Sequence, residues 1–191
     1  MLVLAVTHPD AINRQPRSLS EGGRQQALFV ARRFRELLGK SIRLGLVAAS
    51  PSARCLETAI IVAREFGEAT KDDGLYGGRI EVFEELAEGR GEVGKEETLH
   101  SVLNSLRNKL NLIPKTESVK EEPAVLLAVH GDLANMLKGS AQFAKNFISI
   151  DGHDRQWFES RPVITVLASG AGSLTVKTCE VLRGGEWVSC I

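Results

Sequence analysis

Two histidines, each at the end of an apolar run, are the first residues in this sequence that suggest chemistry. His8 closely follows Leu2–Val6, and His130 directly follows Ala124–Val129. Both runs are continuously apolar, which is typical of strands buried on two faces of a parallel sheet. If the two runs are parallel strands of one sheet, their carboxyl ends meet at one edge. Ligands bind at that edge in open α/β folds, so we expect the two imidazoles to share a site.

A third apolar run adds a cation to this edge. Leu44–Ala49 ends at Ser50-Pro51, and Arg54 stands in the first turn of the helix expected behind it. A guanidinium is planar, always charged and suited to binding phosphate oxygens. We therefore predict an anion site built from three separate stretches of the chain.

Helices are predicted between these strands. Ser20 is a good N-cap, apolar residues repeat at helical spacing after it, and Gly39 is a suitable end. Further helices are expected over 52–66, 96–112 and 133–144. Strands are expected over 2–6, 44–49, 80–83, 124–129, 163–167, 173–182 and 186–189, the last three in a glycine-punctuated, hairpin-like tail.

Strands that alternate with helices predict an α/β protein with three layers, a mainly parallel sheet covered by helices on both faces. The hairpin-like tail predicts antiparallel strands at the C-terminal edge of that sheet. No linker or internal repeat divides the chain, so we expect one domain over residues 1–191.

Composition narrows the class of protein. The chain has 24 basic and 24 acidic residues, which predicts neither a nucleic-acid-binding nor a membrane-binding surface. The apolar start is too short for a signal peptide, and no segment is long enough to span a membrane. The three cysteines form no C-x-x-C pair, so we expect reduced thiols and a cytoplasmic protein, without a bond between Cys179 and Cys190.

Five motifs occur in an order that resembles the histidine phosphatase superfamily, also called phosphoglycerate-mutase-like. Thr7-His8-Pro9 stands where the family has Arg-His-Gly, and Val129-His130-Gly131 matches its second histidine motif. Between them, Arg17–Ala27, Ala49–Ala59 and Phe83–Gly89 resemble the family's three intermediate signatures. The resemblance covers about residues 2–138. It implies the fold of that superfamily and a hydrolase or mutase activity on phosphate esters.

The resemblance also implies a role for each matching side chain. His8 is the nucleophile that forms a phosphohistidine, and Arg54 binds phosphate oxygens. His130 donates to the same oxygens, and Glu85 protonates the leaving group and later activates water. No metal or other cofactor is implied. The short region between Glu85 and Pro123 suggests a small lid, and hence a phosphorylated small molecule or a phosphoprotein as partner.

Two residues depart from the family pattern. Thr7 replaces an arginine and offers one hydroxyl without charge, and Pro9 removes a backbone N–H. The loss of one such donor weakens transition-state binding by about 2–4 kcal/mol. We predict that Arg14 or Arg17 reaches in to replace it, and that Thr7 contributes its hydroxyl to phosphate binding.

Three alternatives stay open. Two His-x-Asp patterns, His8-Pro9-Asp10 and His130-Gly131-Asp132, are able to bind a divalent metal. Ser50 beside His130 suggests a serine nucleophile, although the G-x-S-x-G pattern is missing. Finally, the changes at Thr7 and Pro9 suit a relative that binds a phosphorylated ligand or partner protein without turnover.

Overall fold

The computed structural model describes residues 1–7, 9, 11, 18–39, 42–69, 80–87, 95–112, 122–130, 162–169 and 174–189. The predicted site residues His8, Arg14 and Arg17 lie outside these ranges, as does the helix predicted over 133–144.

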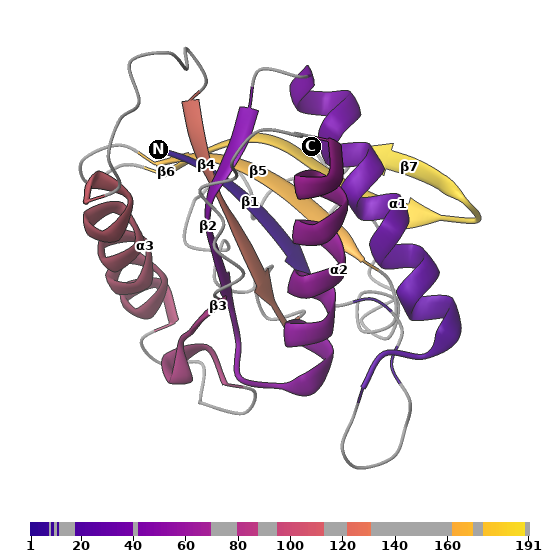
Figure 1. Cartoon of the computed structure of the whole chain (residues 1–191), viewed down its shortest axis with the longest axis horizontal. Helices are drawn as coiled ribbons and strands as arrows, with labels where there is room; N and C mark the ends of the chain where they lie inside the picture. The colour runs from indigo at the N-terminus through magenta and orange to yellow at the C-terminus, as the bar shows by residue number, and fades with distance from the viewer. Residues whose placement is uncertain are drawn as a thin grey trace.

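Seven strands form one sheet in the order β3-β2-β4-β1-β5-β6-β7 (Figure 1). The parallel strands are β1 (Leu2–Thr7), β2 (Ile42–Ala49), β3 (Ile80–Val82) and β4 (Glu122–Val129). The antiparallel strands are β5 (Val163–Ser169), β6 (Leu174–Arg183) and β7 (Glu186–Ser189). The predicted fold class, a mainly parallel sheet with antiparallel C-terminal edge strands, is confirmed.

The described helices lie on both faces of the sheet, α1 (Glu21–Leu38) and α2 (Ala53–Ala69) on one and α3 (Lys95–Asn111) on the other. The Ser20 hydroxyl accepts the Gly23 N–H at 2.9 Å, as expected of an N-cap. Gly39 has φ 68°, the left-handed backbone that ends helices most easily at glycine.

The continuous apolar runs reflect burial on two faces. In β1, Val3 and Ala5 belong to the cluster packed with α3, whereas Leu4 and Val6 belong to the cluster packed with α1 and α2. All four are fully buried. Successive side chains of a strand point to opposite faces, so a strand covered on both sides shows no polar alternation.

An ion pair fastens α1 to the antiparallel part of the sheet. Arg33 makes two hydrogen bonds to the Glu180 carboxylate, at 2.7 Å from Nε and 2.9 Å from Nη2. Its Nη1 also donates to Glu36 at 2.8 Å. These bonds raise the pKa of Arg33 above its ordinary value, with the bond to Glu180 as the largest cause. Glu180 is buried, whereas Glu36 is mostly exposed.

The structure also bears on the predictions about the cysteines and about membrane-spanning segments. Cys55 and Cys179 are buried thiols outside any disulfide bond, and Cys190 lies outside the described residues. In the part of the chain that the structure describes, no helix is long and apolar enough to cross a membrane.

Candidate active site

The carboxyl ends of the four parallel strands meet at one edge of the sheet. Val82 of β3 lies opposite Ala49 of β2, and Ala49 lies opposite Ala128 of β4. Thr7 of β1 lies opposite Val129. The segments that follow these strands therefore stand side by side, in the order of the strands.

Arg54 and His130 meet at this edge, as the sequence predicted. Arg54 Nη2 lies 3.3 Å from His130 Nδ1, and both residues are buried, at 8% and 5% exposure. A guanidinium only donates, so Nδ1 is the acceptor in this contact and a neutral ring carries its proton on Nε2. One nitrogen of His130 is thus held by the arginine, and the other is a donor.

The start of α2 positions Arg54. β2 ends at Ala49, and the carbonyl oxygen of Ser52 accepts the N–H groups of Cys55 and Leu56 at 3.1 and 3.0 Å. Arg54 therefore stands in the first helical turn, where unpaired N–H groups and the helix dipole favour an anion. Thr58 reinforces this turn, because its hydroxyl donates to the Arg54 carbonyl at 2.7 Å.

Thr7 has a contact that the sequence did not reveal. Its Oγ1 accepts the backbone N–H of Val163 at 2.8 Å, and the residue is 2% exposed. The bond continues the pairing of β1 with β5 one step beyond Val6 and Ile164. Since this hydroxyl holds the start of β5, phosphate binding by Thr7 stays a prediction that must be reconciled with a structural role.

Glu85 lies in a short 3-10 helix, Glu84–Leu86, that follows β3 and that the sequence did not predict. Both glutamates are exposed, whereas Leu86 is buried and anchors the turn to the core. Among the described residues, no hydrogen bond or ion pair distinguishes the Glu85 carboxyl from that of Glu84. The assignment of the proton donor to Glu85 therefore still rests on the sequence motif.

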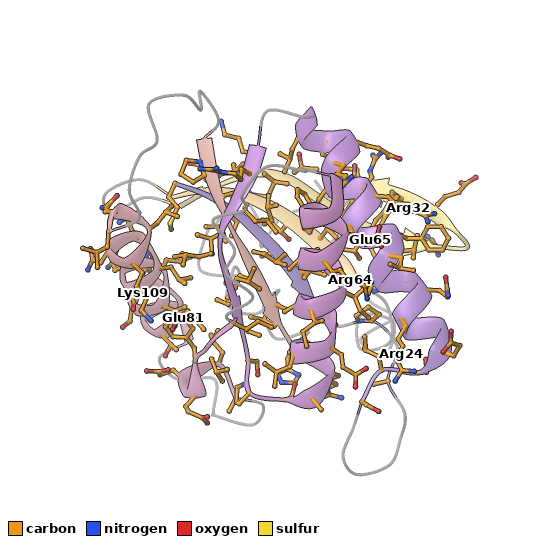
Figure 2. The ribbon with its side chains drawn as sticks, viewed as in Figure 1. Arg24, Arg32, Arg64, Glu65, Glu81 and Lys109 are labelled. Carbon is orange, nitrogen blue, oxygen red and sulfur yellow. The ribbon has the colours of Figure 1, made fainter. Side chains whose placement is uncertain are left out.

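A contact from α3 holds the segment that leads to this turn. Figure 2 shows Lys109 on α3 beside Glu81 of β3, and their N–O distance is 2.5 Å. The same ammonium lies 5.9 Å from the centre of the Phe83 ring, a cation–π distance. Two side chains that frame the end of β3 are thus fixed by one residue of the opposite helix.

Glu57 is a second residue that sequence reasoning missed. Its Oε2 accepts the Leu19 N–H at 3.3 Å and lies 3.5 Å from Arg24 Nε, which Figure 2 labels at the start of α1. Leu19 is fully buried and forms a bridge with Ala11. Glu57 therefore helps to hold Leu19, which follows the predicted phosphate ligands Arg14 and Arg17 in the sequence and pairs with Ala11.

The metal alternative falls outside the described part of the chain, because it needs His8, Asp10 and Asp132. Among the described residues, no group of three or more histidine, cysteine or acidic side chains is placed to hold a metal ion.

The model of the histidine phosphatase superfamily (branch 1) matches residues 7–141. The chain belongs to this superfamily. The match begins at Thr7, contains Arg54, Glu85 and His130, and confirms the resemblance drawn from the sequence. No match is found among curated proteins.

Several solved phosphatase structures share this fold at low sequence identity. A protein histidine phosphatase SixA complexed with tungstate has a TM-score of 0.58 and 19% identity, covering 94% of this chain and 96% of its own. A phosphoserine phosphatase of Entamoeba histolytica has 0.56 and 12%, covering 93% and 95%. A mycobacterial glucosyl-3-phosphoglycerate phosphatase has 0.55 and 16%, covering 92% and 96%. The phosphatases named here differ in substrate, so the shared fold specifies no substrate.

Proposed function

We propose that this protein is a phosphatase that hydrolyses a phosphomonoester or phosphohistidine through a phosphohistidine on His8. The observation that carries the proposal is the buried Arg54–His130 pair at the carboxyl edge of the sheet, in a chain of the histidine phosphatase superfamily. A bound phosphate would give the guanidinium an anion to neutralise. The remaining ring nitrogen of His130 would donate to the same phosphate.

In the proposed reaction, a neutral His8 nitrogen attacks phosphorus and the bond to the leaving group breaks. Glu85, in its acid form, gives its proton to the leaving atom. Glu85 then removes a proton from water, whose oxygen attacks the phosphohistidine, and inorganic phosphate and free His8 result. Arg54 and His130 stabilise the charge on the phosphoryl oxygens in both steps. The charge of Arg54 and the N–H of His130 supply the electrostatic role, so we propose that no metal takes part.

For the substrate, we propose a phosphoprotein or a modest phosphorylated metabolite of the cytoplasm. The region between Glu85 and Pro123 is short, which predicts a small lid and an open site that suits either of these substrates. A mutase is less suited to such a site, because it must retain its intermediate in a closed pocket.

The test is hydrolysis of p-nitrophenyl phosphate by EDTA-treated protein. We expect wild-type turnover to survive EDTA and to vanish in His8→Ala, and Arg54→Gln to lose about 100- to 1000-fold in kcat, the scale of a lost oxyanion donor. His100→Ala is the matched control, because this α3 imidazole has no role in the proposed reaction. Turnover that requires a metal, or that persists in His8→Ala, would contradict the mechanism.

A second candidate function follows from Thr7. The family arginine is replaced by a hydroxyl that already accepts the Val163 N–H, so one charged phosphate contact is lost. A protein that binds phosphorylated ligands without turnover would show tungstate or phosphate binding that depends on Arg54, with no hydrolysis of any phosphomonoester offered.

A further inference from the structure

Ser50 follows β2, the strand that lies between β3 and β4. Its backbone N–H donates to the Ala128 carbonyl at 2.9 Å, which holds it beside the strand that leads to His130. On the other side, the carbonyl of the preceding Ala49 accepts the Phe83 N–H at 3.1 Å. Ser50 is therefore flanked by the segment carrying the proposed acid Glu85 and by the segment carrying His130.

The Ser50 hydroxyl is buried without a hydrogen bond. The residue is 0% exposed, and its Oγ has no partner among the residues that the structure describes. The buried threonines behave differently: the hydroxyls of Thr7, Thr58 and Thr165 contact Val163 N, the Arg54 carbonyl and Cys179 Sγ respectively. A buried polar group without a partner destabilises a protein and calls for a specific explanation.

We infer that Ser50 is a phosphate-binding residue whose hydroxyl donates a hydrogen bond to a phosphoryl oxygen of the substrate. The inference rests on the proposed function, and it adds to it a residue that the motif assigns no role. The serine oxygen forms no covalent bond in this scheme, which separates it from the serine-nucleophile alternative. Arg54 follows four residues later and His130 lies at the end of the adjacent strand, so the three residues stand at the same edge of the sheet.

The burial of Ser50 is no argument against its contact with a ligand. Arg54 and His130 are themselves at most 8% exposed, so we expect a ligand that reaches their polar atoms to come near Ser50 as well. Binding would give the hydroxyl the partner that it lacks within the described structure. The hydroxyl thus contributes to ligand affinity at some expense of stability in the free protein, a combination that functional sites often show.

The experiment compares Ser50→Ala with wild type in two measurements, the melting temperature of the free protein and the affinity for tungstate and inorganic phosphate by calorimetry. We expect the free variant to melt at the same temperature or about 2–4 °C higher, because a buried unpaired hydroxyl is removed. We expect affinity to fall by about 10- to 100-fold, since a hydrogen bond to a charged group is lost. Thr165→Val, which removes a buried hydroxyl from β5, controls for general effects and should bind as wild type does.

The outcomes separate this inference from the proposed function. If Arg54→Gln loses the anion but Ser50→Ala binds it unchanged, the inference is wrong and the phosphatase proposal stands. A clear fall in the melting temperature of free Ser50→Ala also overturns the inference, because it shows that the hydroxyl has a structural partner. If wild type binds neither tungstate nor phosphate, the anion site itself is refuted, and both proposals fail together.

Discussion

Replacement of Thr7 by valine tests the unexpected structural role of this residue. Valine has nearly the same shape, but it removes the oxygen that accepts the Val163 N–H at 2.8 Å. Both residues are almost fully buried, at 2% and 4% exposure, so water cannot easily replace the lost acceptor. An unsatisfied buried donor costs about 1–3 kcal/mol. In a domain of this size the melting temperature falls by about 2–4 °C for each kcal/mol.

Thr165→Val is the matched control for this measurement. Thr165 lies in β5 opposite Ala5 of β1 and is also buried, but among the described residues its hydroxyl bonds to the Cys179 sulfur, at 3.7 Å. Sulfur is a weak acceptor, so the same substitution should cost less than about 1 kcal/mol.

The assay is equilibrium unfolding in urea. The free energies of unfolding of the two variants and wild type are compared, provided that their m-values are equal. We expect Thr7→Val to be the less stable variant by at least about 1 kcal/mol. Equal stability of the two variants would refute the hydrogen bond as a source of stability. The same reasoning predicts that Thr7→Arg, which restores the family residue, destabilises the fold, because it removes the acceptor and places a charge in a buried position.

Two further predictions concern side-chain contacts that join α1, or the residues just before it, to other elements. Glu180→Gln should lower the free energy of unfolding by about 1–3 kcal/mol, whereas Glu36→Gln, which removes the exposed partner of the same Arg33, should change it by less than about 0.5 kcal/mol in urea unfolding. Pairing raises the pKa of Arg33. The stabilisation by the Arg33–Glu180 pair is therefore complete at any pH below the ordinary pKa of arginine, and it is lost only as the pH rises beyond that value. A marked decline between neutral and mildly alkaline pH would therefore contradict the assignment. Glu57→Ala removes the acceptor of the Leu19 N–H and should raise KM for p-nitrophenyl phosphate more than it lowers kcat. Glu57→Gln should restore much of the loss. Equal kinetic constants for wild type and Glu57→Ala would show that this contact does not position the site.

The local pattern of the sequence was enough to predict most elements. Apolar runs such as Ala124–Val129 are strands because both faces of the sheet are covered, and the α1 helix begins and ends at its predicted caps, Ser20 and Gly39. The grouping of Arg54 with His130 followed from the rule that parallel strands end at one edge.

Contacts between distant segments could not be predicted in this way. Nothing in the residues around Thr7 indicates that its hydroxyl meets Val163, and the bond of Glu57 to Leu19 depends on how α2 packs against the start of α1. The 3-10 turn at Glu84–Leu86 is too short to show an apolar period in the sequence. Such features are set by tertiary packing, which single-sequence patterns do not contain.

The place of β1 in the sheet has a consequence for how the chain folds. Leu2 pairs with Ala124 on one side and with Ala168 on the other, so both neighbours of the first strand are made long after it. Until they emerge from the ribosome, the apolar side chains of Val3–Val6 lack the cover that they have in the native protein. Contacts so distant in sequence slow folding and leave exposed strands open to aggregation. A fragment that stops where the family match ends, at residue 141, would also lack β5, so one edge of this apolar strand would stay open to pairing with other chains.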